Sequence, residues 1–380
     1  MTRTNDSVFT RRTMLRGMAA TAGAIGYGSA LTGCGTGSAP GAVGSNLADI
    51  TKLAKKEGKL QLIAYPKTWA NYGGSFKAFT AKYGIEISVA NPDGSSAEEV
   101  TAMKTLKGQS TSPDVVDIGY TFTDQVISEK LVQKYKPSNW DTIPTKLKDP
   151  NAWWVAAYYG AMSIGTNTNV VPAPTKMTDL LDSKYKGKVV LDGDPRTGAS
   201  SLAAVFAAAM ANGGSVGDIQ PGIDFFAELA KRGNLVTTTG IASALSTGQA
   251  AVGLDWNYNF FGIKPQLEKS GVALKTVVPS DAVFGNYYAQ PIVIDCPHPN
   301  AARLWVDWLT SDEGSEQYAL GAAVPARIAD LTKTGKLSKK AVASLPTAEV
   351  LANIVFPTRA EGAKGTKLVV DEWGPKVANQ

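Results

Sequence analysis

The sequence has very little of the chemistry on which most enzymes and metalloproteins depend. Its 380 residues include one histidine, His298, and two cysteines, Cys34 and Cys296. It contains no P-loop, no dinucleotide-binding fingerprint and no Cys/His cluster at the spacing of a zinc site. These absences favour a binding protein over an enzyme, and we expect neither a metal nor another cofactor.

The chain also carries little net charge outside its N-terminal residues. The chain has 38 Lys and Arg against 33 Asp and Glu, but residues 1–33 hold four arginines and one aspartate. The rest of the chain is therefore close to neutral, and it contains no run of basic residues. Proteins that neutralise phosphates keep a basic face on the folded body, so we expect no nucleic-acid partner.

No apolar run is long enough to span a bilayer, and the chain opens with what resembles an export signal. Adjacent Arg11 and Arg12 resemble a twin-arginine signal, and residues 18–31 are weakly apolar and uncharged. Residues 31–34 (Leu-Thr-Gly-Cys) resemble a bacterial lipobox, whose cysteine becomes the acylated first residue of the mature chain. We predict a signal peptide over 1–33; a plain secretory signal with a chance cysteine is the alternative.

The residues after the predicted cleavage site are rich in Gly, Ser and Ala, which is typical of a flexible tether. Residues 34–46 are therefore predicted to be a lipidated Cys34 and its linker. Cys296 would then have no partner for an intramolecular disulfide. Its place at the end of an apolar run predicts a small buried side chain.

Strand-like and helical segments alternate beyond the linker, which predicts an α/β fold with a mostly parallel sheet. The strand-like segments are residues 60–65, 85–89, 115–119, 158–166, 188–191, 250–254 and 289–294. Helical patterns include 75–84 with Gly84 as the stop, 97–106 with Ser95 or Ser96 as N-cap, 201–211 and 299–309. No single seam divides the chain into two sequence halves.

Ligands of open α/β sheets bind beyond the carboxyl ends of the strands. Aromatic and hydroxyl residues recur at these ends, which suits a cleft that stacks against and hydrogen-bonds a small polar solute. For any one of them, a packing residue with a wet tip is the alternative. The candidate ligand-binding residues are Trp69, Tyr72, Ser95, Ser96, Tyr120, Tyr159, Arg196, Thr197, Gly198, Ala199, Ser200, Asp255, Trp256, Tyr258, Tyr287 and Tyr288.

Two of these groups suggest opposite charges on the solute. Residues 197–201 open a helix with hydroxyls, free N–H groups and a glycine, which predicts an anion site to which Arg196 adds a charge. Asp255 lies beside Trp256 and Tyr258, which suits a cation. An ordinary N-cap and a solvated strand-end acid are the respective alternatives.

His298 stands in a loop bounded by two prolines before the helix at 299–309. We interpret it as a polar loop residue. An exported hydrolase is the competing class of function, and it would require His298 to face the cleft within reach of a Ser or Asp.

Several short segments, taken in order, resemble one family. They are residues 57–60 (EGKL), 113–117 (PDVVD), 185–189 (YKGKV), 298–302 (HPNAA) and 308–314 (WLTSDEG). Over residues 58–325 the chain resembles the solute-binding proteins of bacterial ABC importers, in the cluster that includes ferric-iron, polyamine, thiamine and aminoalkylphosphonate binders.

The resemblance implies a type II periplasmic-binding-protein fold, in which two α/β lobes are joined by two crossing strands. The crossings would fall near 158–165 and 286–291. Lobe 1 would then comprise 47–157 and 291–380, and lobe 2 would comprise 158–290. The implied protein is a monomer on the extracytoplasmic face of the membrane, anchored by the lipid at Cys34, with an ABC permease as partner.

The resemblance also limits the solute. An aminoalkylphosphonate, thiamine or thiamine phosphate fits the predicted anion and cation sites best, with a polyamine or ferric iron as alternatives. Ferric-iron members of the family carry adjacent tyrosines where this chain has Trp256-Asn257-Tyr258, which argues against iron.

Overall fold

The computed structural model describes residues 42–237 and 240–378. Gly37–Gln380 forms one compact unit. The predicted signal peptide over 1–33 and the predicted lipidation site Cys34 lie outside the described residues. No helix within the described ranges is long and apolar enough to cross a membrane.

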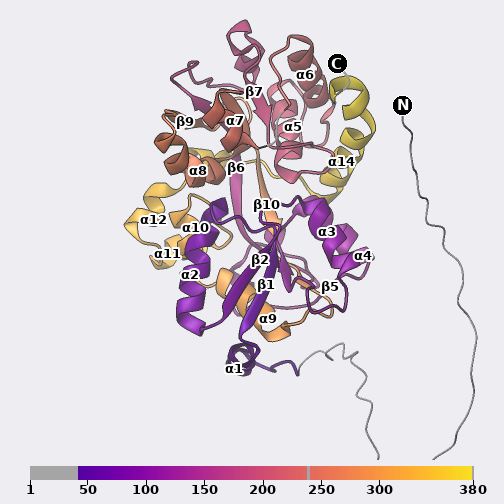
Figure 1. Cartoon of the computed structure of the whole chain (residues 1–380), viewed down its shortest axis with the longest axis vertical. Coiled ribbons are helices and arrows are strands. Elements are labelled where there is room, and N and C mark those ends of the chain that lie inside the picture. Colours follow the sequence, from indigo (N-terminus) through magenta and orange to yellow (C-terminus); the bar gives the residue numbers. More distant parts are fainter. Residues whose placement is uncertain (1–41, 238–239, 379–380) are drawn as a thin grey trace, which may run out of the picture. The chain divides into compact units, whose positions relative to one another are not determined.

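The first lobe is built on a five-stranded sheet in the order β2-β1-β3-β11-β5 (Figure 1). Its strands are β1 (Lys59–Ile63), β2 (Glu86–Ala90), β3 (Val115–Val116), β5 (Val132–Gln133) and β11 (Ile292–Val293). β1 runs parallel to β2 and β3, whereas β11 is antiparallel to β3 and β5. The parallel strands end on one edge, where ligand-binding loops are expected.

The second lobe is built on a sheet in the order β4-β10-β6-β8-β7, with β9 and β12 also paired to β6. Its strands are β4 (Ile118–Gly119), β6 (Ala156–Asn167), β7 (Val189–Leu191), β8 (Val252–Trp256), β9 (Leu274–Val277), β10 (Gly285–Ala289) and β12 (Val324–Pro325). The first half of β6 pairs with β10 and β12, and its second half pairs with β8 and β9. β6 and β10 are therefore the two strands by which the chain passes between the lobes.

Helices cover both sheets. They are α1 (Leu47–Glu57), α2 (Tyr72–Tyr83), α3 (Ser96–Thr105), α4 (Thr123–Ser128), α5 (Ala199–Ala211), α6 (Gln220–Lys231), α7 (Ile241–Thr247), α8 (Asn257–Lys269), α9 (Pro299–Leu309), α10 (Asp312–Leu320), α11 (Ile328–Thr334), α12 (Lys339–Ser344), α13 (Ala348–Asn353) and α14 (Arg359–Trp373). Short helical turns at Trp69–Asn71 and Tyr120–Phe122 precede α2 and α4. α1, α2 and α9 pack on the first lobe, and α5 to α8 pack on the second.

The ends of these helices follow the local sequence. Ser95 and Glu98 form a reciprocal capping box that begins α3, as the predicted N-cap requires. Gly84 ends α2 in the left-handed conformation at φ 71°. α9 has a proline in its first turn and buries Trp305 and Trp308 on its apolar face.

The predicted strand over 115–119 is divided. β3 belongs to the first sheet and β4 to the second, and Asp117 is the residue between them. Apolar residues flank Asp117 on both sides, so the sequence predicts the segment as one strand. The division arises because the chain changes its pairing partner at this point, from β1 to β10.

The C-terminal segment also differs from the prediction, which placed all of 291–380 in lobe 1. α14 packs against α5 and α6, the helices of the second lobe (Figure 1). Two glycines allow the close approach, because a Cβ at Gly365 would lie 2.4 Å from Phe206 and one at Gly362 would lie 2.2 Å from Tyr120. The last helix therefore joins the second lobe to the turn at Tyr120.

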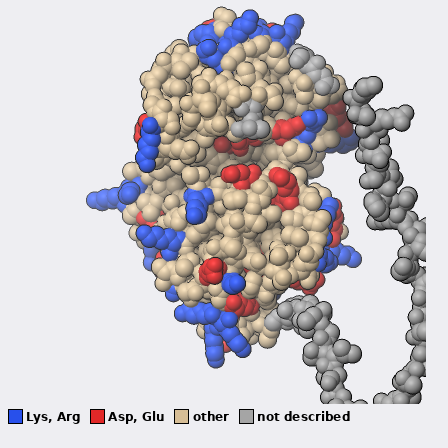
Figure 2. Space-filling view, in the orientation of Figure 1, with Lys and Arg blue, Asp and Glu red and all other residues tan. Residues whose placement is uncertain are grey.

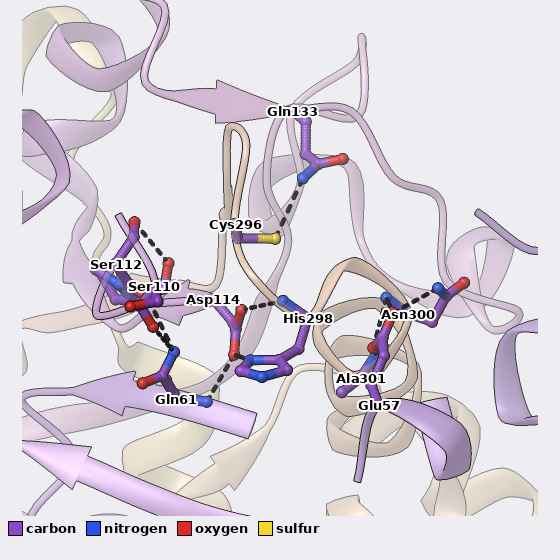
Figure 3. A network of polar contacts seen from close by, with 11 residues as sticks. Glu57, Gln61, Ser110, Ser112, Asp114, Gln133, Cys296, His298, Asn300 and Ala301 are labelled. Carbon is purple, nitrogen blue, oxygen red and sulfur yellow. Dashed lines mark hydrogen bonds and ion pairs between the residues drawn. The ribbon is translucent and has the colours of Figure 1, made fainter. Parts of the chain in front are cut away.

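The end of the predicted linker is fastened to the first lobe. Gly44 donates its N–H to Asn300 Oδ1 at 2.9 Å, and Asn300 Nδ2 donates to the carbonyl of Ala42 at 3.0 Å. The carboxylate of Glu57, at the end of α1, accepts the N–H groups of Asn300 and Ala301 at the start of α9 (Figure 3). Residues 42–44, near the end of the predicted 34–46 linker, are therefore held against the first lobe.

His298 belongs to the same polar network (Figure 3). Its backbone N–H and its Nδ1 both contact the carboxylate of Asp114, at 2.8 and 2.9 Å, and Asp114 is fully buried at the start of β3. Burial lowers the pKa of His298, but the hydrogen bond and charge of Asp114 outweigh it and raise the pKa above its ordinary value. The pair therefore ties the loop before α9 to the first sheet.

The raised pKa of His298 makes its contribution to stability depend on pH. The contribution is complete below the unfolded pKa of about 6.5 and is lost as pH rises through the higher folded value. We expect His298→Gln to lower the free energy of unfolding more at about pH 5.5 than at about pH 8.5. Urea unfolding at both pH values measures this difference. Lys82→Gln is the control. Lys82 pairs with Glu313 on the surface, and the hydrogen bond to Glu313 raises its pKa from 10.5, so Lys82 is charged at both pH values and its replacement should cost the same at each. An equal loss for His298→Gln at both pH values would contradict the assignment.

Candidate functional site

A cavity of about 700 Å³ lies between the lobes. Residues from the carboxyl ends of β1, β2 and β7 line it, together with the start of α5 and parts of β8, α8 and β10. Figure 2 shows Asp and Glu side chains gathered along the groove between the upper and lower parts of this face. The cavity therefore lies where the strand-end rule places a ligand.

The structure brings a subset of the predicted site residues to this cavity. Those that line it are Trp69, Ser95, Ser96, Thr197, Gly198, Ala199, Ser200, Asp255 and Tyr288. These residues come from both lobes, so a solute in the cavity would lie between the two lobes. Ala64 and Ala70, on either side of the loop that leads to Trp69, have φ of 58° and 45°, and such strain is concentrated at functional sites.

Three predicted aromatic residues lie behind the cavity wall. Tyr72, Trp256 and Tyr258 are fully buried. Trp256 and Tyr258 stack at 6.2 Å between ring centroids, and Trp69 meets Tyr258 edge-on at 5.6 Å. They support the lining residues and do not line the cavity themselves.

Four other predicted residues are not among the described residues that line the cavity. Tyr287 stacks on Trp154, Tyr120 packs against Gly362 of α14, and Tyr159 meets Phe356 edge-on. Arg196 is not among the described lining residues, because its guanidinium turns to Asp194, with Nε 3.0 Å from each carboxylate oxygen. The predicted role of Arg196 in an anion site is therefore corrected to an ion pair beside the cavity.

Of the predicted anion site, the structure contains the uncapped N-terminus of helix α5. α5 begins at Ala199 with Gly198 as N-cap, and no side chain caps its free N–H groups. Ser200 is buried, and its hydroxyl lies 3.2 Å from the hydroxyl of Tyr288. The alternative that we considered for these residues, an ordinary N-cap by a side chain, does not occur.

Carboxyl groups are the dominant polar feature of the cavity. Asp93, Glu98, Glu99 and Asp117 line it from the first lobe, and Asp192, Asp194 and Asp255 line it from the second. None of the described lining residues is Lys or Arg. Arg196 neutralises Asp194 from outside, but the cavity as a whole is acidic.

Asp255 is held rigidly in the second lobe. It is buried at the end of β8, its Oδ1 accepts the N–H of Trp256 at 2.7 Å, and its Oδ2 accepts Nδ2 of Asn259 at 2.8 Å. Burial raises the pKa of Asp255, and among the smaller effects a side-chain hydrogen bond from Ser200 lowers it. An ionised carboxylate has about four acceptor positions, so about one remains for a solute.

Asp117 is the centre of a buried network where the lobes meet. Its Oδ2 accepts the hydroxyls of Tyr72 and Tyr158, each at 2.8 Å, and Nε2 of Gln290 donates to its Oδ1. Tyr158 lies on β6 and Gln290 follows β10, so Asp117 contacts both crossing strands. Tyr158 also accepts Nε1 of Trp69 at 2.6 Å, which connects this network to the cavity wall.

The protonation of these carboxyls depends on what the cavity holds. Burial raises the pKa of Asp117 to about 7, although the hydrogen bonds from Tyr158, Tyr72 and Gln290 lower it. Burial and then the charge of Asp117 raise the pKa of Glu99, whose Oε1 accepts the N–H of Asp117 at 2.8 Å. The cavity therefore disfavours ionised carboxylates unless a positive charge compensates them.

The two lobes also present acids to each other. Burial raises the pKa of Asp192, and the charge of Asp93 on the opposite lobe raises it further. Burial and then Asp192 raise the pKa of Asp255. When both are ionised, Asp93 and Asp192 therefore repel each other across the cleft.

Most of the cavity acids were not among the predicted site residues. Asp192 directly follows the predicted strand over 188–191, and Asp93 lies in the turn after the predicted strand over 85–89, so the strand-end rule that selected the aromatic residues applies to both. Glu99 was obscured because acids at a helix start also suit the helix dipole, and Asp117 because the predicted strand ran through it. Asn259, in the first turn of α8, had no signal in the sequence.

His298 is not among the described residues that line the cavity, because it faces Asp114 within the first lobe. The condition that we set for an exported hydrolase is therefore not met. Within residues 42–237 and 240–378, no group of three or more His, Cys, Asp or Glu side chains is placed to hold a metal ion.

Residues 110–351 match the family described as bacterial extracellular solute-binding protein. The chain is also 27% identical over 257 residues to an uncharacterised protein of Haemophilus influenzae, a match that covers 63% of this chain and 69% of that protein.

Solved structures of periplasmic binding proteins share the fold. The protein AfuA of Actinobacillus pleuropneumoniae, with fructose-6-phosphate bound, has a TM-score of 0.67 at 20% identity, over 85% of this chain and 99% of AfuA. Iron-bound HitA of Pseudomonas aeruginosa has a TM-score of 0.63 at 18% identity, over 83% and 99%. The spermidine/putrescine-binding protein PotD of Streptococcus pneumoniae has 0.57 at 14%, over 82% and 99%. These similarities confirm the predicted two-lobed α/β fold of the type II class.

The network at Asp117 gives a direct test. Tyr158→Phe removes a hydrogen bond that lowers the pKa of Asp117, so we expect that pKa to rise above its value of about 7. Titration of the Asp117 carboxyl carbon by NMR measures it. Tyr120→Phe is the matched control, because the Tyr120 hydroxyl has no hydrogen-bond partner among the described residues. An unchanged or lower pKa in Tyr158→Phe would show that the network is wrongly assigned.

Proposed function

Because the chain belongs to the bacterial extracellular solute-binding proteins, we propose that it captures a small cationic solute between its lobes and delivers it to the permease of an ABC importer. The family match confirms the resemblance seen in the sequence motifs and the prediction of a binding protein rather than an enzyme. A solute that contacts both lobes favours the closed arrangement over the open one.

The observation that carries this proposal is the charge of the cavity. Carboxyl groups of both lobes line it, and no Lys or Arg stands among the described lining residues. A buried carboxylate without a counter-charge is costly, and an opposite charge within about 4–6 Å restores its ionised form. A cationic solute therefore supplies the counter-charge that the lining lacks.

Polyamines and thiamine are the candidates from our sequence analysis that carry a positive charge without needing an anion site. Trp69 and Tyr288 line the cavity and offer aromatic surface to either solute. The binding of spermidine and putrescine by PotD-type proteins, which share this fold at low identity, is consistent with the first candidate.

A zwitterion such as an aminoalkylphosphonate, or thiamine phosphate, is the second candidate. The uncapped start of α5 supports it, because free N–H groups at a helix N-terminus attract anions. The surrounding Asp192, Asp194 and Asp255 oppose it, since they repel a phosphate or phosphonate. We therefore place the cationic solute first.

The location of the protein is part of the proposal. The family is extracellular, and the paired arginines and lipobox-like residues support export by the twin-arginine route and lipid anchoring at Cys34. A tethered monomer beside its permease is the arrangement that we propose.

Asp255→Asn tests the charge of the site, because it keeps the shape of the side chain and removes its charge. We expect spermidine to bind about 100-fold more weakly, since breaking a buried charge pair costs roughly 3 kcal/mol. Isothermal titration calorimetry with spermidine, thiamine, an aminoalkylphosphonate and inorganic phosphate compares the candidates. Asp371→Asn, on the exposed side of α14, is the matched control. Tight binding of phosphonate with none of spermidine or thiamine would overturn the cationic solute in favour of the zwitterion.

Cys34→Ser tests the anchor. Cells fed an alkyne-tagged fatty acid are expected to label the wild-type protein and to leave the variant unlabelled, because the thiol is the acceptor of the lipid. In cell fractionation, we expect the wild-type protein in the membrane fraction and the Cys34→Ser variant in the soluble extracytoplasmic fraction. Cys296→Ser is the control, because that thiol is buried. Labelling that persists in Cys34→Ser would refute the lipobox assignment.

A further inference from the structure

Asn259 has a hydrogen-bonding capacity that the protein itself does not use. It lies in the first turn of α8, lines the cavity, and is only 6% exposed. Its Nδ2 donates to Asp255 Oδ2 at 2.8 Å, whereas its Oδ1 has no partner among the described residues. A buried acceptor without a donor costs about 1–3 kcal/mol. Because Asn259 lines the cavity, a solute held there is the source from which this donor can come.

The orientation of the amide is fixed by Asp255. Because the amino end of Asn259 donates to the carboxylate, the carbonyl end is the one left without a donor. Trp256 N–H and Asn259 Nδ2 occupy one acceptor position on each oxygen of Asp255. The acceptor capacity that remains on the carboxylate and the free amide oxygen therefore form a group of acceptors with a negative charge.

We propose that Asp255 and Asn259 form a subsite for an ammonium group that carries N–H bonds, so that the solute is a protonated primary or secondary amine. This inference rests on the proposed function and narrows the class of cation. A quaternary cation, such as a trimethylammonium group or the thiazolium of thiamine, satisfies the charge of Asp255. It cannot donate to Asn259 Oδ1, which then stays buried and unpaired.

The rest of the cavity suits the hydrocarbon part of such an amine. Ile241 and Ile263 line it from α7 and α8, and Trp69 and Tyr288 line it as well. Asp93 and Glu99 of the first lobe provide carboxyls for a second amino group. An aliphatic diamine therefore has a partner for each end and apolar contacts for its middle.

The experiment compares putrescine with its bis(trimethylammonium) analogue, which has the same charge and the same carbon chain but no N–H. Calorimetry on the full chain is expected to give an affinity for putrescine about 100-fold higher, because a site built to hydrogen-bond an N–H strongly rejects an analogue that lacks it. Asn259→Leu removes the support of Asp255 for both cations, so it should weaken both, but it should weaken putrescine about tenfold more than the analogue, because only putrescine also loses a hydrogen bond from a charged donor. Two controls test whether the fold persists. One is Asn259→Gln, which keeps the amide, and the other is a circular-dichroism melt of each variant.

The outcomes separate this inference from the proposed function. If the analogue or thiamine binds as tightly as putrescine, the ammonium subsite is wrong but a cationic solute remains. If Asn259→Leu weakens both cations equally, Asn259 acts through the fold and the subsite is also wrong. If no cation binds the wild-type chain, the proposed function fails and the subsite with it. The comparison on the wild-type chain alone can overturn the inference, even where a variant does not fold.

Discussion

The arrangement of the two lobes depends on the hydrogen bonds that the carboxylate of Asp117 accepts. This carboxylate stands where the first sheet ends and the second begins, and it accepts hydrogen bonds from Tyr72 of the first lobe and Tyr158 of β6. Gln290, which follows β10, donates to its other oxygen. One buried acid thus holds together the points at which the chain passes between lobes. Such a group is costly to bury unless its acceptor positions are filled, and here they are filled by the residues that must not separate.

The same acid belongs to the cavity, so the joint between the lobes and the solute site share their electrostatics. Asp117 and Glu99 lie on one side, and Asp192 and Asp255 lie on the other. All four carboxyls have a raised pKa, with burial as the first cause. A positive charge placed among them favours their ionised forms and strengthens the hydrogen bonds that Asp117 accepts from the tyrosines. Solute charge and lobe geometry are therefore linked through one network.

The sequence predicted what is local. The stop at Gly84, the cap at Ser95 and the helix over 299–309 all follow from neighbouring residues, and the structure contains each of them. Where strand ends coincide with hydroxyl or aromatic residues, as at Trp69 and Ser95, it pointed to residues that line the cavity. What it missed depends on pairing between distant segments. The change of sheet at Asp117 is set by β1 and β10, and the packing of α14 on the second lobe depends on Phe206 and Tyr120 beyond Gly365 and Gly362. Arg196 was assigned to the ligand because its pairing with Asp194 cannot be seen in composition.

The bonds between Asn300 and residues Ala42 and Gly44 have a mechanical consequence for a protein held at a surface. Ala42 and Gly44 are thereby fixed to the start of α9, which belongs to the first lobe. A pull on the chain from its N-terminal side is therefore taken up first by the first lobe, and it reaches the second lobe through the crossing strands β6 and β10.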